Sequence, residues 1–234
     1  MKLSHLALSL VVGLAAPLAL GPAGASAQPK KAPPAKGAPA GPSANEVADG
    51  VQKFYDKSQT FKAGFEQRYW VKAYNKTKDS KGTVIFQKPG KMSWRYTSNG
   101  NRVVSDGKLI KVYEADNKQM YEQSMDKSQY PAALAFLVGG GNLKKEFKLR
   151  KLSSAEMKFE GGHVLEGIPK KPTPAYNKIV LYVDGNTYQV RRVLLLDAQG
   201  NRNRFTFLSP SINEKVAAGE FEFKPPPGTQ VIKP

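Results

Sequence analysis

Short runs of alternating apolar and polar residues, separated by tight-turn dipeptides, recur along most of this chain. Alternation with a period of two is typical of a strand with one buried face, and Asp106-Gly107 and Asp184-Gly185 are typical of hairpin turns. The strands do not alternate with helices, which argues against a Rossmann or P-loop fold. The sequence therefore predicts an antiparallel meander, and hence a barrel or a strongly curved sheet.

The predicted strands are short and follow one another at regular intervals. The first is the longest and places Phe61, Phe65 and Tyr69 on one apolar face. Later strands are expected at residues 83–87, 92–96, 102–105, 109–114, 119–123, 147–152, 163–168, 177–183, 189–196 and 202–208.

The segment before the first strand has a helical pattern instead. This helix is expected to run from Asn45, a favourable N-cap residue, to Lys57. Val51, Phe54 and Tyr55 fall on one face of it, so that face is predicted to pack on the sheet.

A second helix is expected at residues 131–138, a segment that is almost wholly apolar and is followed by three glycines at 139–141. Because this helix has no polar face, it must be covered on most sides. It would lie either in the mouth of a barrel or packed on the outside of the sheet.

The N-terminus has the pattern of an export signal. A positively charged start precedes an apolar run over residues 6–20, and Ala25-Ser26-Ala27 matches the small-residue site that signal peptidase recognises. We expect residues 1–27 to be a signal peptide cleaved after Ala27, so that the mature protein is exported. An uncleaved membrane anchor is the alternative.

Residues 28–44 are mostly Pro, Ala, Gly and Lys, so they are predicted to form a disordered linker ahead of a single domain at 45–234. Without Lys2 and the three lysines of this linker, 32 basic residues face 19 acidic ones, a net charge of +13. That charge fits basic side chains on the solvent face of the strands, or attraction to an anionic membrane or acidic partner. Nucleic acid is the weaker alternative, because an exported protein rarely meets it.

The chain has no cysteine and, outside the predicted signal peptide, its one histidine is His163. This composition excludes disulfides, thiol chemistry, a cysteine-based zinc site and acylation of the protein itself at a cysteine. No catalytic motif surrounds His163, so we expect neither an enzyme nor a cofactor or metal. A hydrolase with two paired carboxylates stays an alternative, with Glu66, Asp106, Glu114 and Glu122 as candidates.

Four segments carry short motifs in order along the domain. They are residues 58–67 (SQTFKAGFEQ), 86–96 (FQKPGKMSWRY), 104–113 (VSDGKLIKVY) and 221–228 (FEFKPPPG). Together with the apolar segment at 131–138, they resemble the LolA family of periplasmic lipoprotein carriers. Each motif alone is weak, but four in the family's order are specific, and the resemblance covers most of residues 45–234.

The resemblance implies a mainly β (α+β) fold: an unclosed antiparallel β-barrel with a helical lid over an apolar cavity for acyl chains. It implies a monomeric periplasmic chaperone that takes acylated lipoproteins from an inner-membrane ABC transporter of the LolCDE type to the outer membrane. An outer-membrane receptor of the LolB type, or direct membrane delivery, would complete the route. The alternative is a lipid-binding or sensor module on the same scaffold, with a free lipid or a membrane regulator as its partner.

The candidate site residues are apolar and come from strands and helices alike. For the cavity wall we predict Phe61, Phe65, Tyr69, Phe86, Met92, Trp94 and Tyr96. For the helical lid we predict Val51, Phe54, Tyr55, Leu134, Phe136 and Leu137. Each would also fit an ordinary packed core, because alternation marks a buried face without showing whether it is hollow.

Lys88 marks a departure from the family. The family commonly has arginine before the hairpin proline, where its guanidinium holds the lid by hydrogen bonds, and lysine stands at that position here. Lysine keeps the charge but lacks the planar fork of donors. Lys88 is therefore the candidate lid clamp, and closure of the lid would be weaker or would use another residue.

Overall fold

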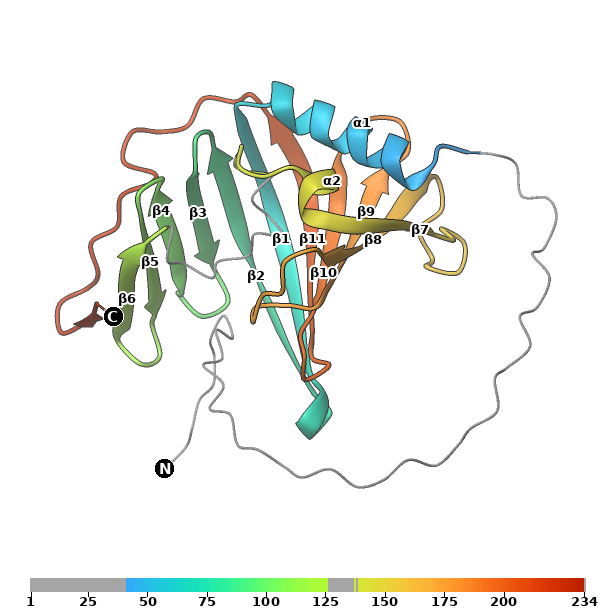
Figure 1. Ribbon diagram of the computed structural model, residues 1–234. Coiled ribbons are helices and arrows are strands. Elements are labelled where there is room, and N and C mark those ends of the chain that lie inside the picture. Colours follow the sequence, from blue (N-terminus) through green and yellow to red (C-terminus); the bar gives the residue numbers. More distant parts are fainter. Residues whose placement is uncertain (1–40, 126–136, 138, 234) are drawn as a thin grey trace.

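The computed structural model describes residues 41–125, 137 and 139–233, which form one curved sheet with a helix lying across it (Figure 1). The strands are β1 (Thr60–Val71), β2 (Lys76–Gln87), β3 (Lys91–Tyr96), β4 (Arg102–Asp106), β5 (Leu109–Glu114), β6 (Gln119–Ser124), β7 (Phe147–Leu152), β8 (Gly162–Pro169), β9 (Lys178–Asp184), β10 (Val190–Leu196), β11 (Arg202–Ile212) and β12 (Gln230–Ile232). The helices are α1 (Ala44–Lys57), α2 (Leu143–Glu146) and the 3-10 helix η1 (Lys72–Tyr74).

The described strands form a single sheet in the order β12-β6-β5-β4-β3-β2-β1-β11-β10-β9-β8-β7. Neighbours are antiparallel except for β12, which lies parallel to β6. β1 joins the two parts of the meander, because it pairs with β2 on one side and β11 on the other. The outermost strands, β12 and β7, do not pair with each other, so the predicted unclosed antiparallel barrel is confirmed.

Each predicted strand is present, but the boundaries and short elements differ. β2 begins at Lys76 instead of residue 83, because its first half is polar and carries no apolar alternation. The first strand ends at Val71, and η1 follows it. β12 and α2 were not predicted, since elements of three and four residues are too short to show a period.

Helix α1 is amphipathic and lies over one face of the sheet, called the inner face below (Figure 1). The prediction of Asn45 as N-cap is wrong: Ser43 caps the helix, because Glu46 lies three residues after it and completes a capping box. Ser43 Oγ accepts from the Glu46 amide at 3.3 Å, and Glu46 Oε2 accepts from the Ser43 amide at 2.7 Å. No described helix combines the length and apolar composition needed to cross a membrane.

The main core lies between α1 and the inner face. Val47, Val51 and Tyr55 of the helix are almost completely buried against strand residues from both parts of the meander. A smaller apolar cluster lies on the opposite, outer face, where Met157 and Phe159 pack on β8 and β9. The sheet is therefore apolar over the part of its inner face that α1 covers and in one area of its outer face.

The chain after β11 crosses the outer face of β3–β5 and then ends in β12 (Figure 1). Glu220 accepts hydrogen bonds from Ser93 Oγ at 2.7 Å and from Arg95 Nη2 at 2.8 Å. The Phe223 ring lies 5.4 Å from the ring of Tyr113. These contacts attach the closing motif FEFKPPPG to the sheet.

Candidate functional site

Strand register brings the predicted aromatic residues together in rows across the inner face. Phe61 lies opposite Phe86, which lies opposite Met92, and Trp94 lies opposite Val84 in the next row. Alternate residues of a strand face the same side, and directly opposed residues have neighbouring side chains. The motifs at 58–67 and 86–96 therefore build one continuous surface, although turns separate them in sequence.

The rings of this surface form a connected aromatic cluster. Phe65 lies edge-on to Trp94 and to Tyr96, with ring centroids 4.9 and 5.0 Å apart. Phe86 lies 5.6 Å from Trp94, and Phe205 of β11 lies 5.2 Å from it. Such T-shaped and tilted contacts are the favourable arrangement for aromatic pairs. Trp94 is at the centre of the cluster.

Most of the predicted site residues whose placement is described belong to this inner-face core. Phe61, Phe65, Phe86, Met92, Trp94, Val51, Tyr55 and Leu137 are its buried members, and Phe54 and Tyr96 are half-buried beside them. Tyr69 faces the same side but lies farther along β1, where it lines a small pocket with Leu195 and Asn203. Leu134 and Phe136 lie outside the described residues.

Sequence reasoning missed two rings of the cluster, Phe205 and Phe207 of β11. Phe207 lies opposite Phe65, and the ring of Phe207 lies 5.3 Å from that of Phe61. The signal was present, because both alternate with polar residues in the strand predicted at 202–208. The sequence does not show that this strand pairs with β1, more than 130 residues earlier in the chain.

Three polar groups of aromatic side chains lie within or beside the apolar cluster. The Trp94 indole Nε1 is buried and has no hydrogen-bond partner among the described residues. Burial raises the pKa of the Tyr96 hydroxyl far above its ordinary value of 10.0. The Tyr55 hydroxyl differs, because it accepts a hydrogen bond from the Val190 amide at 3.1 Å. A buried donor without any partner costs about 1–3 kcal/mol, so a partner from outside the described residues would stabilise the Trp94 position.

Lys88 lies between the end of α1 and the end of the predicted lid. Its Nζ donates to the carbonyl oxygens of Tyr55 and Asp56, at 2.5 and 3.1 Å. The last carbonyls of a helix have no partner within the helix and carry a partial negative charge, which suits an ammonium group. Gly139, at φ +82°, lies against the same side chain: a Cβ there would be 2.8 Å from Lys88 Cδ. Lys88 thus contacts both segments that border the aromatic cluster.

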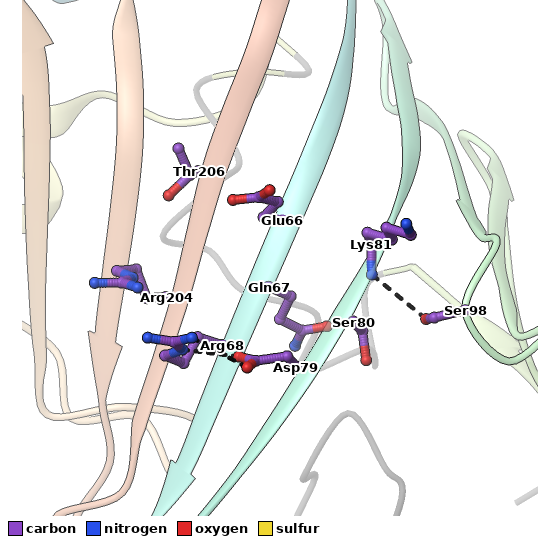
Figure 2. Close-up of a pocket in the computed structure, with 9 residues that line it drawn as sticks. All are labelled: Glu66, Gln67, Arg68, Asp79, Ser80, Lys81, Ser98, Arg204 and Thr206. Carbon is purple, nitrogen blue, oxygen red and sulfur yellow. Dashed lines mark hydrogen bonds and ion pairs between the residues drawn. The ribbon is translucent and has the colours of Figure 1, made fainter.

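The outer face of the same strands has the opposite character. Figure 2 shows a pocket on β1, β2 and β11 with charged side chains around it, among them Glu66, Arg68 and Arg204. Arg68 makes a two-bond ion pair with Asp79 at 2.8 and 3.1 Å, and this hydrogen bonding lowers the pKa of the Asp79 carboxyl. An acyl chain in this pocket would remove water from the charged side chains and could not replace the hydrogen bonds of that water. The pocket therefore does not suit an acyl chain.

Three of the four candidate carboxylates are engaged by neighbouring groups of the structure. Asp106 accepts from the Lys108 and Leu109 amides at 2.8 Å and thereby closes a hairpin turn. Glu114 accepts from Asn117 at 2.7 Å, and Glu122 forms ion pairs with Lys111 and Lys233. Within the described part of the chain no group of three or more metal-binding side chains is found.

An open sheet with a helix across an apolar, aromatic-rich face offers a surface that suits an apolar ligand. The family model described as "Outer membrane lipoprotein carrier protein LolA" matches residues 56–224. This chain belongs to the LolA family.

Relatives from several bacteria match over most of their length. The chain is 31% identical to the outer-membrane lipoprotein carrier protein of Cupriavidus taiwanensis, over 80% of this chain and 88% of that one. It is 30% identical to the protein of the same name from Bordetella avium, over 84% of this chain and 91% of that one. A solved LolA superfamily structure from Nitrosomonas europaea covers 78% of this chain and 99% of its own, with 12% identity and a TM-score of 0.44.

Proposed function

We propose that this protein is a carrier of outer-membrane lipoproteins that encloses their acyl chains against the aromatic inner face. The observation that carries the proposal is the continuous aromatic cluster around Trp94, in a chain of the LolA family. Relatives that bear the name outer-membrane lipoprotein carrier protein match over most of their length, which supports the same role for this chain.

The physical need for such a carrier follows from the cost of exposing lipid. Each methylene transferred to water costs about 0.8 kcal/mol, so one chain of roughly sixteen carbons costs about 12 kcal/mol. Two or three such chains do not cross an aqueous compartment uncovered. An apolar face that a mobile segment can cover and uncover solves this problem, provided that binding is weak enough for release.

Lys88 and Leu137 suit the roles of clamp and lid. Leu137 is 3% exposed and belongs to the inner-face core, so the end of the predicted lid helix packs where acyl chains would bind. Lys88 contacts the last carbonyls of α1 and Gly139 just beyond Leu137. Entry of a chain would require Leu137 to leave the core and these contacts to rearrange. The protein would act by this movement alone, without catalysis.

The predicted export signal, with cleavage after Ala27, supports action in the periplasm. In this role a LolCDE-type transporter in the inner membrane would load the protein, and a LolB-type receptor or the outer membrane itself would unload it. Loading requires energy from the donor, because an empty carrier has its apolar face already covered. The protein would work as a monomer. Its apolar inner face would be covered by α1 or by cargo, and so would not be available to a second copy of the chain.

The direct test is mass spectrometry of what co-purifies when the mature, tagged protein is isolated gently from its own periplasm. A stoichiometric triacylated lipoprotein is the expected result. Free lipid alone would contradict the lipoprotein cargo and favour the lipid-binding alternative. No bound lipid, together with no uptake of a fluorescent lipid probe, would contradict the acyl-chain site itself.

A pair of matched variants tests where the lipid lies. Leu137→Glu puts a charge into the buried site and is expected to weaken probe binding at least tenfold, because an unpaired charge is strongly disfavoured there. Leu208→Glu makes the same change on the outer face, where the side chain is 42% exposed, and should leave binding unchanged. Circular dichroism checks that both fold, and Leu134→Glu in the predicted lid serves if Leu137→Glu does not.

A further inference from the structure

The β1–β2 hairpin extends beyond the rest of the sheet on the β3 side. β3 pairs with β2 from Gly82 to Gln87, and Lys81 still bonds to Thr97 just after β3. Residues 76–80 have their strand pairing with β1 alone. Figure 1 shows the tip, which contains η1, projecting at the end of the sheet away from α1. The predicted strand at 83–87 gave no indication of this extension. The tip is therefore a separate surface, distant from the aromatic cluster.

The tip combines one exposed ring with unpaired positive charge. Tyr74 is 75% exposed, more than any other large apolar side chain that the structure describes as exposed. Lys72, Lys76 and Lys78 surround it in sequence, and all three are exposed. None of these lysines forms an ion pair with a described residue.

The acidic groups near the tip are already engaged. Asp79 is held in its two-bond ion pair with Arg68. Asp197, in the neighbouring β10–β11 turn, accepts from the Asn201 amide at 2.9 Å and from its side-chain Nδ2 at 2.8 Å. Asp197 keeps its negative charge in these bonds, but residues 70–78 contain three lysines and no acidic residue. The tip therefore has a net positive charge, and a positive field extends outward from it.

Local contacts hold the tip in one conformation. The Trp70 indole donates to Asn75 Oδ1 at 3.1 Å, and Asn75 has the left-handed conformation that closes the turn. The Lys72 amide donates to Asn201 Oδ1 at 2.9 Å, and the guanidinium of Arg202 lies 5.1 Å from the centre of the Trp70 ring. A surface ordered in advance loses little conformational entropy when it binds.

We propose that this tip, residues 70–78, docks the protein on a membrane surface of anionic phospholipid. Tyrosine and tryptophan favour the headgroup region of a bilayer, because one end of the side chain is apolar and the other is polar. Basic residues near an anionic leaflet each contribute about 1 kcal/mol. Single-stranded nucleic acid fits less well, because its binding needs several rings in a row and the tip exposes one.

Docking through the tip would bring the carrier to a membrane with the inner face still covered. The inference deepens the proposed carrier function by naming the surface that meets the membrane. It rests on the geometry and charge of the hairpin and not on bound cargo. The two proposals therefore fail separately: membrane binding is measured on protein without lipoprotein, and cargo binding is measured without membranes.

The experiment is co-flotation of the mature protein with vesicles of phosphatidylcholine, with and without phosphatidylglycerol. Binding is expected only to the anionic vesicles and should weaken with salt. The triple variant K72Q/K76Q/K78Q should lower the partition coefficient on the order of 100-fold. Tyr74→Ser should lower it further without any change in charge. Circular dichroism and a melting curve verify the fold of each variant.

The matched control removes three exposed lysines elsewhere, at Lys108, Lys171 and Lys215, whose side chains have no ion pair with a described residue. K108Q/K171Q/K215Q should lose less than about fivefold in partition, because these charges lie away from the tip. Equal losses in the two triple variants would overturn the proposal in favour of diffuse charge attraction. Equal binding to neutral vesicles, or no binding to anionic ones, would overturn it as well.

Discussion

The two halves of the inner face are packed with different side chains under one helix. Beneath the first turns of α1, strands β8–β10 supply aliphatic residues such as Leu181 and Val193, both completely buried. Beneath its end, β1–β3 and β11 supply large rings, among them that of Trp94, whose Nε1 has no hydrogen-bond partner in the part of the chain that the structure describes. The aliphatic half resembles a finished core. The aromatic half retains a buried donor with no partner among the described residues, and such a group lowers the stability of a packed core.

The largest effect is expected in the aliphatic half. Leu181→Ala should lower the free energy of unfolding by about 2–5 kcal/mol, because it leaves a cavity in a core that cannot collapse. The binding of an acyl-chain probe should stay unchanged at temperatures where the variant is folded. Urea unfolding and probe titration measure the two quantities. Loss of probe binding with little loss of stability would contradict this assignment, in which the aliphatic half stabilises the fold and the aromatic half binds the ligand.

Substitutions of Lys88 test the contact between the end of α1 and the aromatic cluster. Lys88→Met keeps the length and apolar stem of the side chain but removes two hydrogen bonds to carbonyls, and should cost about 1–3 kcal/mol. Lys88→Arg keeps a cation and should recover most of that stability. If Lys88 is the clamp, the methionine variant also releases a bound probe faster than the arginine variant. Equal release rates, measured by stopped-flow fluorescence, would leave Lys88 a purely structural residue.

Trp94→Phe addresses the unpartnered indole. It removes the five-membered ring of the indole together with its N–H. The lost apolar contact lowers the stability, and the removal of a buried donor raises it, so the two effects oppose each other. The change in the free energy of unfolding should be smaller than about 1 kcal/mol in either direction. In the unmodified protein, an acyl chain brominated along its length should quench Trp94 fluorescence. Quenching that comes entirely from Trp70, as a Trp94→Phe control would show, contradicts a site in the aromatic half.

The sequence predicted the architecture because alternation and turn dipeptides act locally. Asp106 and Gly107 close a hairpin through contacts within three residues, so the signal is complete where it occurs. The aromatic cluster was predicted in those segments where one motif holds several of its rings, as at Phe86 and Trp94. Phe205 was missed because its contribution depends on long-range pairing of β11 with β1.

The beginning of α1 shows the same limit on a smaller scale. Asn45 is a favourable capping residue when it is considered alone. A capping box, however, pairs the side chain of Glu46 with a capping residue three positions earlier, and that residue is Ser43. Leu134 and Phe136 of the predicted lid, outside the described residues, stay predictions.

The smallest effects are expected from two carboxylates on the outer face, one behind each half. Glu166, behind the aliphatic half, has its pKa lowered by hydrogen bonds from Lys178 and Arg150. Burial alone would raise the pKa of Glu220, behind the aromatic half, but hydrogen bonds from Arg95 and Ser93 lower it. In both cases the folded protein favours the ionised form, so the stabilisation is full above the ordinary pKa of 4.5 and is lost as the pH falls below it.

Glu166→Gln and Glu220→Gln should each reduce stability at pH 7 and flatten its decline at acid pH, which thermal melts across the range measure. Neither should change binding of an acyl-chain probe at pH 7, because both side chains lie on the face away from the aromatic cluster. Altered probe affinity in Glu220→Gln alone would mean that the closing segment acts on the aromatic half through β3. The distinction between the two halves would then extend through the sheet to its outer face.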